Sequence, residues 1–275
     1  MAALKLSGYK QKAIPVILEP WHSYLNNDPS ERDDTLKLLS YNIQVGIHTK
    51  QYRDYVLKAW QHLLPSRSRL VNLDKIAQLV RHFDLIALQE VDGGSIRTQF
   101  INQVDYLAKA ADKKFWHQQR NRNLGRWGQH SNGVISDFEP IKIDNHELPG
   151  LKGRGAIAFE VGKIEPVLIV VVHLALTREA QNKQLVYIKN LINRYRHAIV
   201  MGDMNTHSLR ILNDSPLAEC GLKSAHARAT YPSWRPVKCF DQILISRHLN
   251  IVRMAVLDFA LSDHLPVAIE IERPF

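Results

Sequence analysis

The sequence predicts two packed mixed β-sheets with helices on the outside, in one domain. Strands and helices alternate in the first half of the chain, which is typical of βαβ units with parallel strands. In the second half, strands follow one another and indicate antiparallel hairpins. The chain has 275 residues, of which 45% are hydrophobic and 23% charged. This is an ordinary globular composition, and the length allows a substantial core.

The first half of the chain is expected to begin with an arm and to continue into a βαβ unit. Residues 1–34 contain three prolines and a polar run, so we predict an N-terminal arm there and the folded domain over 35–275. The elements expected next are strands over 36–43 and 84–91, helices from Asn72 and over 102–111, and a basic loop over 117–131.

The second half is expected to hold more strands than helices. Gly162 and Lys163 separate two apolar runs and predict a hairpin. The expected strands lie over 133–136, 156–161, 167–174, 199–201, 240–246, 252–257 and 265–271, with a helix over 178–194 and mostly helix and loop over 206–238.

The stretch 197–205 places two polar side chains directly after a buried strand. Gly202 follows three apolar residues, and Asp203 and Asn205 then stand two positions apart. In an extended chain, such residues point to the same face. Crevices at the carboxyl ends of strands are where open α/β sheets bind ligands. A simple turn is the alternative, because glycine, aspartate and asparagine are common in turns.

Polar residues of the same kind end other apolar strands. They are Asn42, Gln89 with Glu90, His173, Asp203 with Asn205, Asp241, and Asp263 with His264. Each alone is explained as a turn residue or a packed polar group, but their recurrence at strand ends favours a common site. Asp241 lies inside the apolar run 239–245, where an unpaired carboxylate is costly. We therefore predict that Asp241 has a cationic or hydrogen-bonding partner.

Six short motifs occur in a fixed order over 36–271. They are Leu39-Ser-Tyr-Asn42, Leu88-Gln-Glu-Val91, Val172-His-Leu174, Met201-Gly-Asp-Met-Asn205, Phe240-Asp-Gln-Ile243 and Leu261-Ser-Asp-His-Leu-Pro266. With this ordered set the sequence resembles the endonuclease/exonuclease/phosphatase superfamily, which has the deoxyribonuclease I-like fold. The resemblance implies a four-layer α/β sandwich and divalent-metal-dependent cleavage of phosphate esters.

The resemblance also implies a role for each matching position. Metal ligands are expected at Asn42, Glu90 and Asp263, an all-oxygen set that suits Mg²⁺ or Mn²⁺. Catalytic roles are expected for His173, Asp203, Asn205, Asp241 and His264.

Among the catalytic positions, Asp203 resembles the residue that activates or orients the attacking water, and Asn205 resembles one that positions the phosphate or the water. The two histidines, His173 and His264, resemble the pair that stabilises charge on the phosphoryl oxygens. Asp241 resembles the buried partner that orients His264 and favours its protonated form. This assignment supplies the partner that the buried Asp241 requires.

The sequence differs at two positions from many abasic-site endonucleases of the superfamily, and two further residues are expected to bind substrate. Many abasic-site endonucleases of the superfamily have an acidic residue where this chain has Gln44, and they tend to lack the histidine found here at His173. The resemblance therefore does not imply abasic-site specificity. Asn132 resembles an asparagine that faces the phosphate, and Arg154 lies in a glycine-rich loop suited to an anion. For both, a solvated loop is an equal alternative.

The net charge of +9 and the pI of about 9.5 favour anionic partners. Basic residues gather in three segments near the predicted site strands, with aromatics that could stack on bases. These residues are Arg53, Lys58, Arg67 and Arg69, then Arg120, Arg122 and Arg126, then Lys152 and Arg154, with Tyr52, Tyr55, Trp60 and Trp127 among them.

We therefore expect a phosphodiesterase, a nuclease acting on nucleic acid. The alternative is a phosphatase or phospholipase C-like hydrolase of a phosphorylated small molecule or of anionic lipid, because aromatics with bases also suit a membrane surface. A binding protein that has lost catalysis is a third class. It would predict decay at Glu90, Asp203 or His264, and all three are present.

The cysteines and the apolar runs bear on the compartment. Cys220 and Cys239 form no CxxC pair, and the second lies in an apolar run as a packed thiol would. The N-terminus lacks a continuous apolar segment of signal-peptide length, and no run approaches a membrane span. We expect a soluble, cytoplasmic, monomeric protein without a transmembrane segment.

Overall fold

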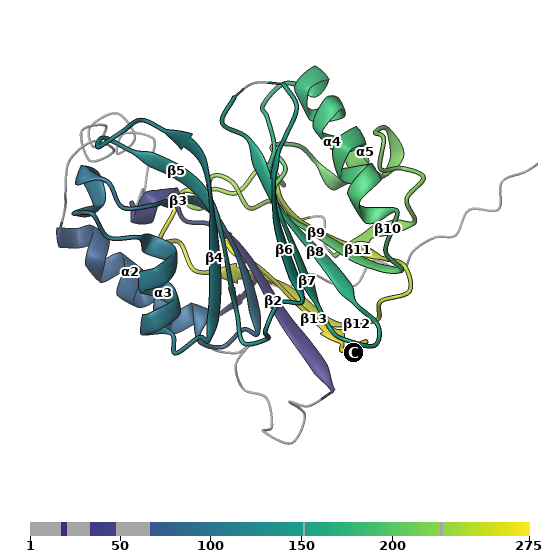
Figure 1. Ribbon diagram of the computed structural model, residues 1–275, viewed down its shortest axis with the longest axis horizontal. Coiled ribbons are helices and arrows are strands. Elements are labelled where there is room, and N and C mark those ends of the chain that lie inside the picture. The colour runs from purple at the N-terminus through teal and green to yellow at the C-terminus, as the bar shows by residue number, and fades with distance from the viewer. Residues whose placement is uncertain (1–17, 21–33, 48–66, 151, 226–227) are drawn as a thin grey trace, which may run out of the picture.

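Two β-sheets pack face to face in the computed structural model, with helices on the outer face of each (Figure 1). The structure describes residues 18–20, 34–47, 67–150, 152–225 and 228–275. The two packed sheets with their outer helices confirm the predicted four-layer α/β sandwich. Of the predicted arm, Leu18–Pro20 forms β1, which pairs with a strand of the first sheet, and Asp34 is also described. The rest of 1–34 lies outside the described residues.

The first sheet has seven strands among the residues described, in the order β1-β12-β13-β2-β3-β5-β4. Its other strands are β2 (Thr35–Asn42), β3 (Leu85–Asp92), β4 (Phe115–Asn123), β5 (Gln129–Ser136), β12 (Ile251–Asp258) and β13 (Val267–Glu272). β2 and β3 are parallel, and helix α2 (Arg67–Val80) lies between them in the chain, which confirms the predicted βαβ unit. The helix begins five residues before the predicted Asn72. Helix α3 (Gln103–Ala110) matches its prediction.

The second sheet has six described strands, in the order β10-β11-β9-β8-β7-β6. They are β6 (Lys142–Glu147), β7 (Gly155–Val161), β8 (Val167–His173), β9 (His197–Asp203), β10 (Leu222–Ser224) and β11 (Asp241–Ser246). β8 and β9 are parallel, with α4 (Arg178–Ile192) between them in the chain, and α5 (Ser208–Asn213) follows β9. The predicted hairpin of β7 and β8 is confirmed.

The basic loop predicted over 117–131 is wrong, because most of it forms the hairpin of β4 and β5. β4 is the edge strand of the first sheet, and its sequence FWHQQRNRN buries little. The strand β6, with the sequence KIDNHE, was not predicted and is the edge of the second sheet. Polar side chains are typical of sheet edges, so neither strand shows the apolar alternation that marks a strand in sequence.

Three apolar layers hold the sandwich together. The central layer lies between the sheets and includes Leu36 and Leu38 of β2. The next residues along, Leu39 and Tyr41, point to the opposite face and pack with α2 and α3. A third layer fills the space between the second sheet and α4. Both cysteines are free thiols. In the described part of the chain, no helix is long and apolar enough to cross a membrane.

Candidate active site

The inward side chains of the two sheets change from apolar to polar at one end of the sandwich. In β9, Ile199 and Met201 face the central layer, so Asp203 continues the same row. Asp203 stands in register with Asp241 of β11 on one side and with His173 of β8 on the other. In the first sheet, Asn42 at the end of β2 pairs with Gln89. The alternation that builds the core therefore also aims these polar groups at one another.

Gly202 lets β8 and β9 meet closely beneath this row. Its φ is +143°, and a Cβ built on it would lie 1.9 Å from the carbonyl oxygen of Val172. We expect Gly202→Ala to lower the free energy of unfolding by about 3 kcal/mol or more, because backbone strain and overpacking add. Gly221→Ala is the matched control, since Gly221 also has a positive φ, of +63°, but open space around it. Equal losses for the two variants in thermal melts would contradict the close-approach argument.

Glu90 is turned into the site by an irregularity in β3. The pairing of β3 with β5 shifts register between Leu88 and Val91, and Glu90 has a φ of 53°. Such a left-handed conformation in a residue with a side chain is strained and is common at functional sites. The Nδ2 of Asn42 donates to Glu90 Oε1 at 3.3 Å.

Asp92, two residues after Glu90, holds the end of β3 in place through several side-chain contacts. Arg97 Nε donates to Asp92 Oδ2 at 2.5 Å. Ser95 Oγ donates to the same carboxylate oxygen at 2.9 Å. Burial would raise the pKa of Asp92, but Arg97 and the hydrogen bonds outweigh it and hold that pKa below its usual range. Asp92 is not among the predicted site residues, and the only sequence signal for it is an acidic residue directly after an apolar strand.

Asp203 links the two sheets. Asn42 Nδ2 donates to Asp203 Oδ2 at 3.1 Å across the sandwich, and the backbone amide of Asn205 donates to Asp203 Oδ1 at 2.9 Å. The side-chain amide of Asn205 donates to the carbonyl of Leu174 at 3.0 Å. The bonds from Asn42 and from the backbone of Asn205 fix the orientation of the Asp203 carboxylate.

Two imidazoles flank Asp203 Oδ2, at 3.5 Å from His173 Nε2 and 3.8 Å from His264 Nε2. His264 Nδ1 bonds Asp241 Oδ2 at 2.8 Å, and Thr230 Oγ1 donates to the same oxygen at 2.5 Å. Asp241 is fully buried, so His264 is the partner that the sequence required for it.

The two histidines have opposite charge preferences. Burial alone would lower the pKa of His264, but the negative charges of Asp241 and Asp203 outweigh it and hold that pKa well above the ordinary value. Burial, and then the charge of Arg154, hold the pKa of His173 well below the ordinary value. The site therefore contains one imidazolium and one neutral imidazole at neutral pH.

The negative charge of the carboxyl groups in the site is only partly balanced by nearby positive side chains. Burial is the main cause that raises the pKa of all three carboxyl groups, and neighbouring carboxylates raise it further. The pKa of Glu90 lies above its ordinary value, and those of Asp203 and Asp263 are each about 6. His264 opposes each of these shifts. A divalent cation would relieve the remaining charge, and the oxygen donors of Asn42, Glu90 and Asp263 suit Mg²⁺ or Mn²⁺. The two carboxylates therefore fit the predicted metal, whereas Asn42 turns its Nδ2 toward Glu90 and Asp203, and its Oδ1 accepts from the backbone amide of Gln44 at 3.2 Å.

A second donor set, Asp203, Asp241 and His264, also brings one atom each within 4.8 Å of the others. The Asp241 oxygen that faces His264 already takes part in two hydrogen bonds. We therefore interpret this set as a hydrogen-bonded array that orients His264.

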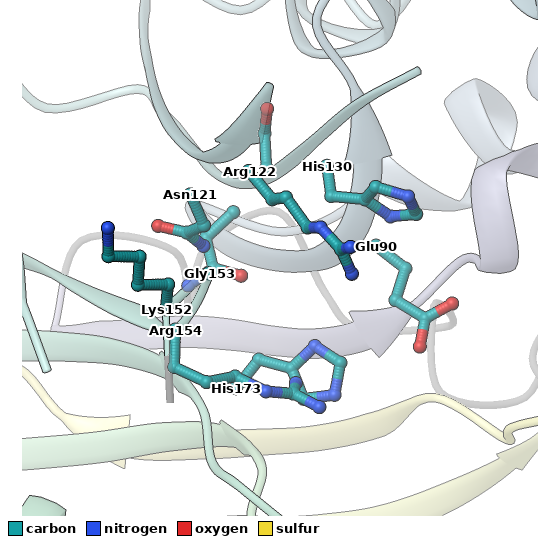
Figure 2. Close-up of a pocket in the computed structure, with 10 residues that line it drawn as sticks. Glu90, Asn121, Arg122, His130, Lys152, Gly153, Arg154 and His173 are labelled. Atoms are coloured by element: carbon teal, nitrogen blue, oxygen red, sulfur yellow. The ribbon is translucent and has the colours of Figure 1, made fainter. Parts of the chain in front are cut away.

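A cavity of about 390 Å³ opens beside Glu90 and His173 (Figure 2). Asn132 and Arg154, both predicted to contact substrate, line it. Asn132 Nδ2 donates to the carbonyl of Gly155 at 3.0 Å, so its orientation is fixed across the two sheets. Burial is the main cause that lowers the pKa of Arg154, while the charges of Asp203 and Glu90 act to raise it.

The structure brings all ten predicted site residues to one end of the sandwich. Their individual roles stay predictions. The cavity is also lined by Asn121, His130 and Ser131, which are not among the predicted site residues. They lie on the edge hairpin that was mistaken for a loop.

The basic rim predicted around the site is only partly described. Arg53 and Lys58, with Tyr52, Tyr55 and Trp60, lie outside the described residues, as does the side chain of Arg67. Arg126 and Trp127 are exposed beyond the end of β4. The prediction is wrong for Arg69, which is 3% exposed. It stands on the inner side of α2, and its Cγ lies 3.0 Å from where a Cβ on Gly46 would be.

Metal-suited carboxylates, an aspartate-bound imidazolium and a cationic cavity are groups that can stabilise the charge of a phosphate ester during hydrolysis. Comparison with protein families agrees. The profile of the Endonuclease/Exonuclease/phosphatase family matches residues 39–264, and the chain belongs to this family.

Solved structures share the fold at low sequence identity. The endonuclease/exonuclease/phosphatase from Beutenbergia cavernae DSM 12333 is 17% identical with a TM-score of 0.65, over 87% of this chain and 72% of that one. The mannosyl-6-phosphatase Bt3783 of Bacteroides thetaiotaomicron VPI-5482 is 16% identical with a TM-score of 0.63, over 86% and 100%. ANGEL2, a 2',3'-cyclic phosphatase, is 14% identical with a TM-score of 0.62, over 86% and 95%. No curated protein matches the chain.

Proposed function

We propose that this protein is a divalent-metal-dependent phosphodiesterase that cleaves nucleic acid by in-line attack of water. The observation that carries the proposal is the lining of the cavity beside Glu90 and His173. The described residues that line it are Glu90, Asn121, Arg122, His130, Ser131, Asn132, Lys152, Gly153, Arg154 and His173. None has an apolar side chain. Such a surface suits phosphate groups better than an acyl chain.

The proposed metal ligands are Asn42, Glu90 and Asp263. A bound Mg²⁺ or Mn²⁺ would supply Lewis-acid polarisation of a phosphoryl oxygen. Asp203 stands between the two imidazoles with its carboxylate fixed by Asn42 and Asn205, so it can orient a water and accept its proton.

The remaining side chains of the site stabilise charge and orientation. His264 is held as an imidazolium by Asp241, and it can donate from Nε2 to an oxygen that gains charge during the attack. His173 is neutral and can donate one hydrogen bond without adding a second positive charge. Asn132 and Arg154 can hold the non-bridging oxygens of the phosphate in the cavity.

The experiment that tests the proposal is an activity panel with Mg²⁺. It covers plasmid, single-stranded DNA, RNA, an abasic duplex, a small sugar phosphate, and phosphoinositide and sphingomyelin vesicles. We expect hydrolysis of polynucleotides, weakening steeply with salt because several phosphates release counterions on binding. Ready hydrolysis of the sugar phosphate or of either lipid, with every polynucleotide intact, would replace the nuclease proposal by the phosphatase or phospholipase alternative.

Metal dependence is tested separately. We expect EDTA to abolish turnover and Mg²⁺ or Mn²⁺ to restore it, because the oxygen donors of Asn42, Glu90 and Asp263 suit hard cations. Binding of the cation should also raise Tm, since a ligand that binds only the folded state stabilises it. Full activity after exhaustive chelation, with no change in Tm on adding Mg²⁺, would refute the proposed metal site.

A further inference from the structure

We propose that Arg122 and Lys152 form a subsite for a second phosphate of the substrate, next to the phosphate that is cleaved. This inference rests on the proposed function and narrows it. The preferred substrate is then an oligonucleotide that extends across the edges of the two sheets, and not a mononucleotide ester held only at Glu90 and His173.

The cavity beside the catalytic residues continues into a second, larger one. The first has a volume of about 390 Å³ and the second about 720 Å³, and they share Asn121, Lys152, Gly153 and Arg154 in their walls. The second is also lined by Arg120 of β4 and by Asn145 of β6. Together they form a channel that leads away from Glu90 between the two edge hairpins, with room for more than one nucleotide unit.

The cations along this channel form no direct ion pair with the residues described, although the charges of Asp203 and Glu90 act on Arg154. Arg122, Lys152 and Arg154 take part in none of the ion pairs that the structure shows, and no described group accepts a hydrogen bond from their side chains. Elsewhere, cations on the same molecule are paired, as in Lys113 with Asp137 at 2.6 Å and Arg178 with Asp214 at 2.6 Å. The only acidic residues among those lining the channel are Glu90, a proposed metal ligand, and Glu147. The channel is therefore left positively charged.

Arg122 and Arg154 reach the channel from different sheets. Arg122 is on β4, and its guanidinium approaches Glu90 from the side of His130, whereas Arg154 lies beside His173 on the other side (Figure 2). Lys152 extends away from both toward the outer part of the channel. The three positive charges are thus spread along the channel. This arrangement suits successive phosphates better than a single phosphate group.

Gly153, which stands between Lys152 and Arg154, lies close to the side chain of Arg122. Gly153 has a φ of +95°, and a Cβ built on it would lie 3.3 Å from Arg122 Cβ. A glycine at this position permits both the conformation and the close approach. The segment between Lys152 and Arg154 therefore lies against the side chain of Arg122, which brings the cations of the proposed subsite together.

The test compares kcat/KM for thymidine dinucleotides with a 5′-phosphate, with a 3′-phosphate and with neither. The wild-type protein is expected to prefer one phosphorylated form by about tenfold, the size of one hydrogen bond between charged groups. The preferred end also gives the direction of the strand in the channel. Arg122→Ala and Lys152→Ala are each expected to reduce this preference to about twofold or less. Arg122→Lys keeps the positive charge and is expected to retain part of the preference for the phosphorylated dinucleotide.

Lys163→Ala and Arg247→Ala are the matched controls. Each removes an exposed cation that follows β7 or β11 at the end of the strand far from the site, and both should keep the full preference. Hydrolysis of bis(p-nitrophenyl) phosphate reports on the chemistry without a second phosphate. If the protein cleaves this ester but shows no preference, or if the preference survives in Arg122→Ala and Lys152→Ala, the subsite is refuted while the proposed function stands. If no phosphodiester is cleaved at all, the proposed function fails and the subsite with it.

Discussion

Replacing Asp241 by alanine is expected to lower kcat by about 10³- to 10⁴-fold and to destabilise the fold by about 3–5 kcal/mol. Asp241 is fully buried, and its Oδ2 lies 2.8 Å from Nδ1 of His264. Without the carboxylate, His264 is left as a buried cation or must lose its proton. It then no longer presents a fixed, charged Nε2 to the phosphoryl oxygens. One substitution should therefore damage both stability and turnover.

Thr230→Val is the matched control for Asp241→Ala. It removes the hydroxyl that donates to the same carboxylate oxygen at 2.5 Å but keeps the pair with His264. The same hydroxyl also accepts from the backbone amide of Asp241 at 3.3 Å, so the expected cost is that of two buried hydrogen bonds, about 1–3 kcal/mol, and kcat should fall far less than in Asp241→Ala. Denaturant unfolding and steady-state kinetics measure both effects. A stable, active Asp241→Ala variant would show that His264 does not depend on this carboxylate.

The positions of the site residues could be predicted because core and site share one periodicity. The inward row of β9 runs from Ile199 through Met201 to Asp203, so the rule that buries the first two also aims the third. The same holds for β11, where Asp241 precedes Ile243 and Ile245 in the central layer. A polar residue that continues an apolar row is a signal that a single sequence contains.

The contacts between the sheets could not be predicted from spacing. Asn42 and Asp203 bond across the sandwich although 161 positions separate them in the chain. No local pattern encodes which strand end meets which. The opposite charge preferences of His173 and His264 likewise come from their surroundings, since Arg154 stands beside one and Asp241 beside the other.

The predictions of secondary structure and exposure fail mainly where side chains do not pack in the apolar core. β4 and β6 were missed because edge strands next to a polar channel carry Arg120, Arg122 or Asn145 in place of apolar residues. Arg69 was placed on the rim because arginine is usually exposed, yet its helix position turns it inward. The residues that could set substrate choice were therefore the hardest to locate from sequence.

Replacing Asp203 by asparagine is expected to separate turnover from stability. The change removes the proposed proton acceptor, so kcat should fall by about 10²- to 10⁴-fold. Burial is the main cause that raises the pKa of Asp203 to about 6, above its value in an unfolded chain. At pH 7.5 the ionised carboxylate therefore opposes folding. That opposition begins to fall as pH drops below the raised pKa of about 6, and it is gone only below the pKa of an unfolded chain, 3.8. An amide removes the charge and keeps an oxygen for the backbone amide of Asn205. Its nitrogen then faces Nδ2 of Asn42, and the lost hydrogen bond offsets about 1 kcal/mol of the gain.

In EDTA at pH 7.5, Asp203→Asn should consequently unfold at a Tm equal to or above that of the wild-type protein, with a gain of at most about 3 kcal/mol. The advantage should shrink at pH 5, where the wild-type carboxyl is protonated in the folded state. Asp241→Ala, measured alongside, should be strongly destabilised under the same conditions. If Asp203→Asn loses as much stability as Asp241→Ala, or if it retains wild-type kcat, then Asp203 is a structural residue and another group must accept the proton of the attacking water.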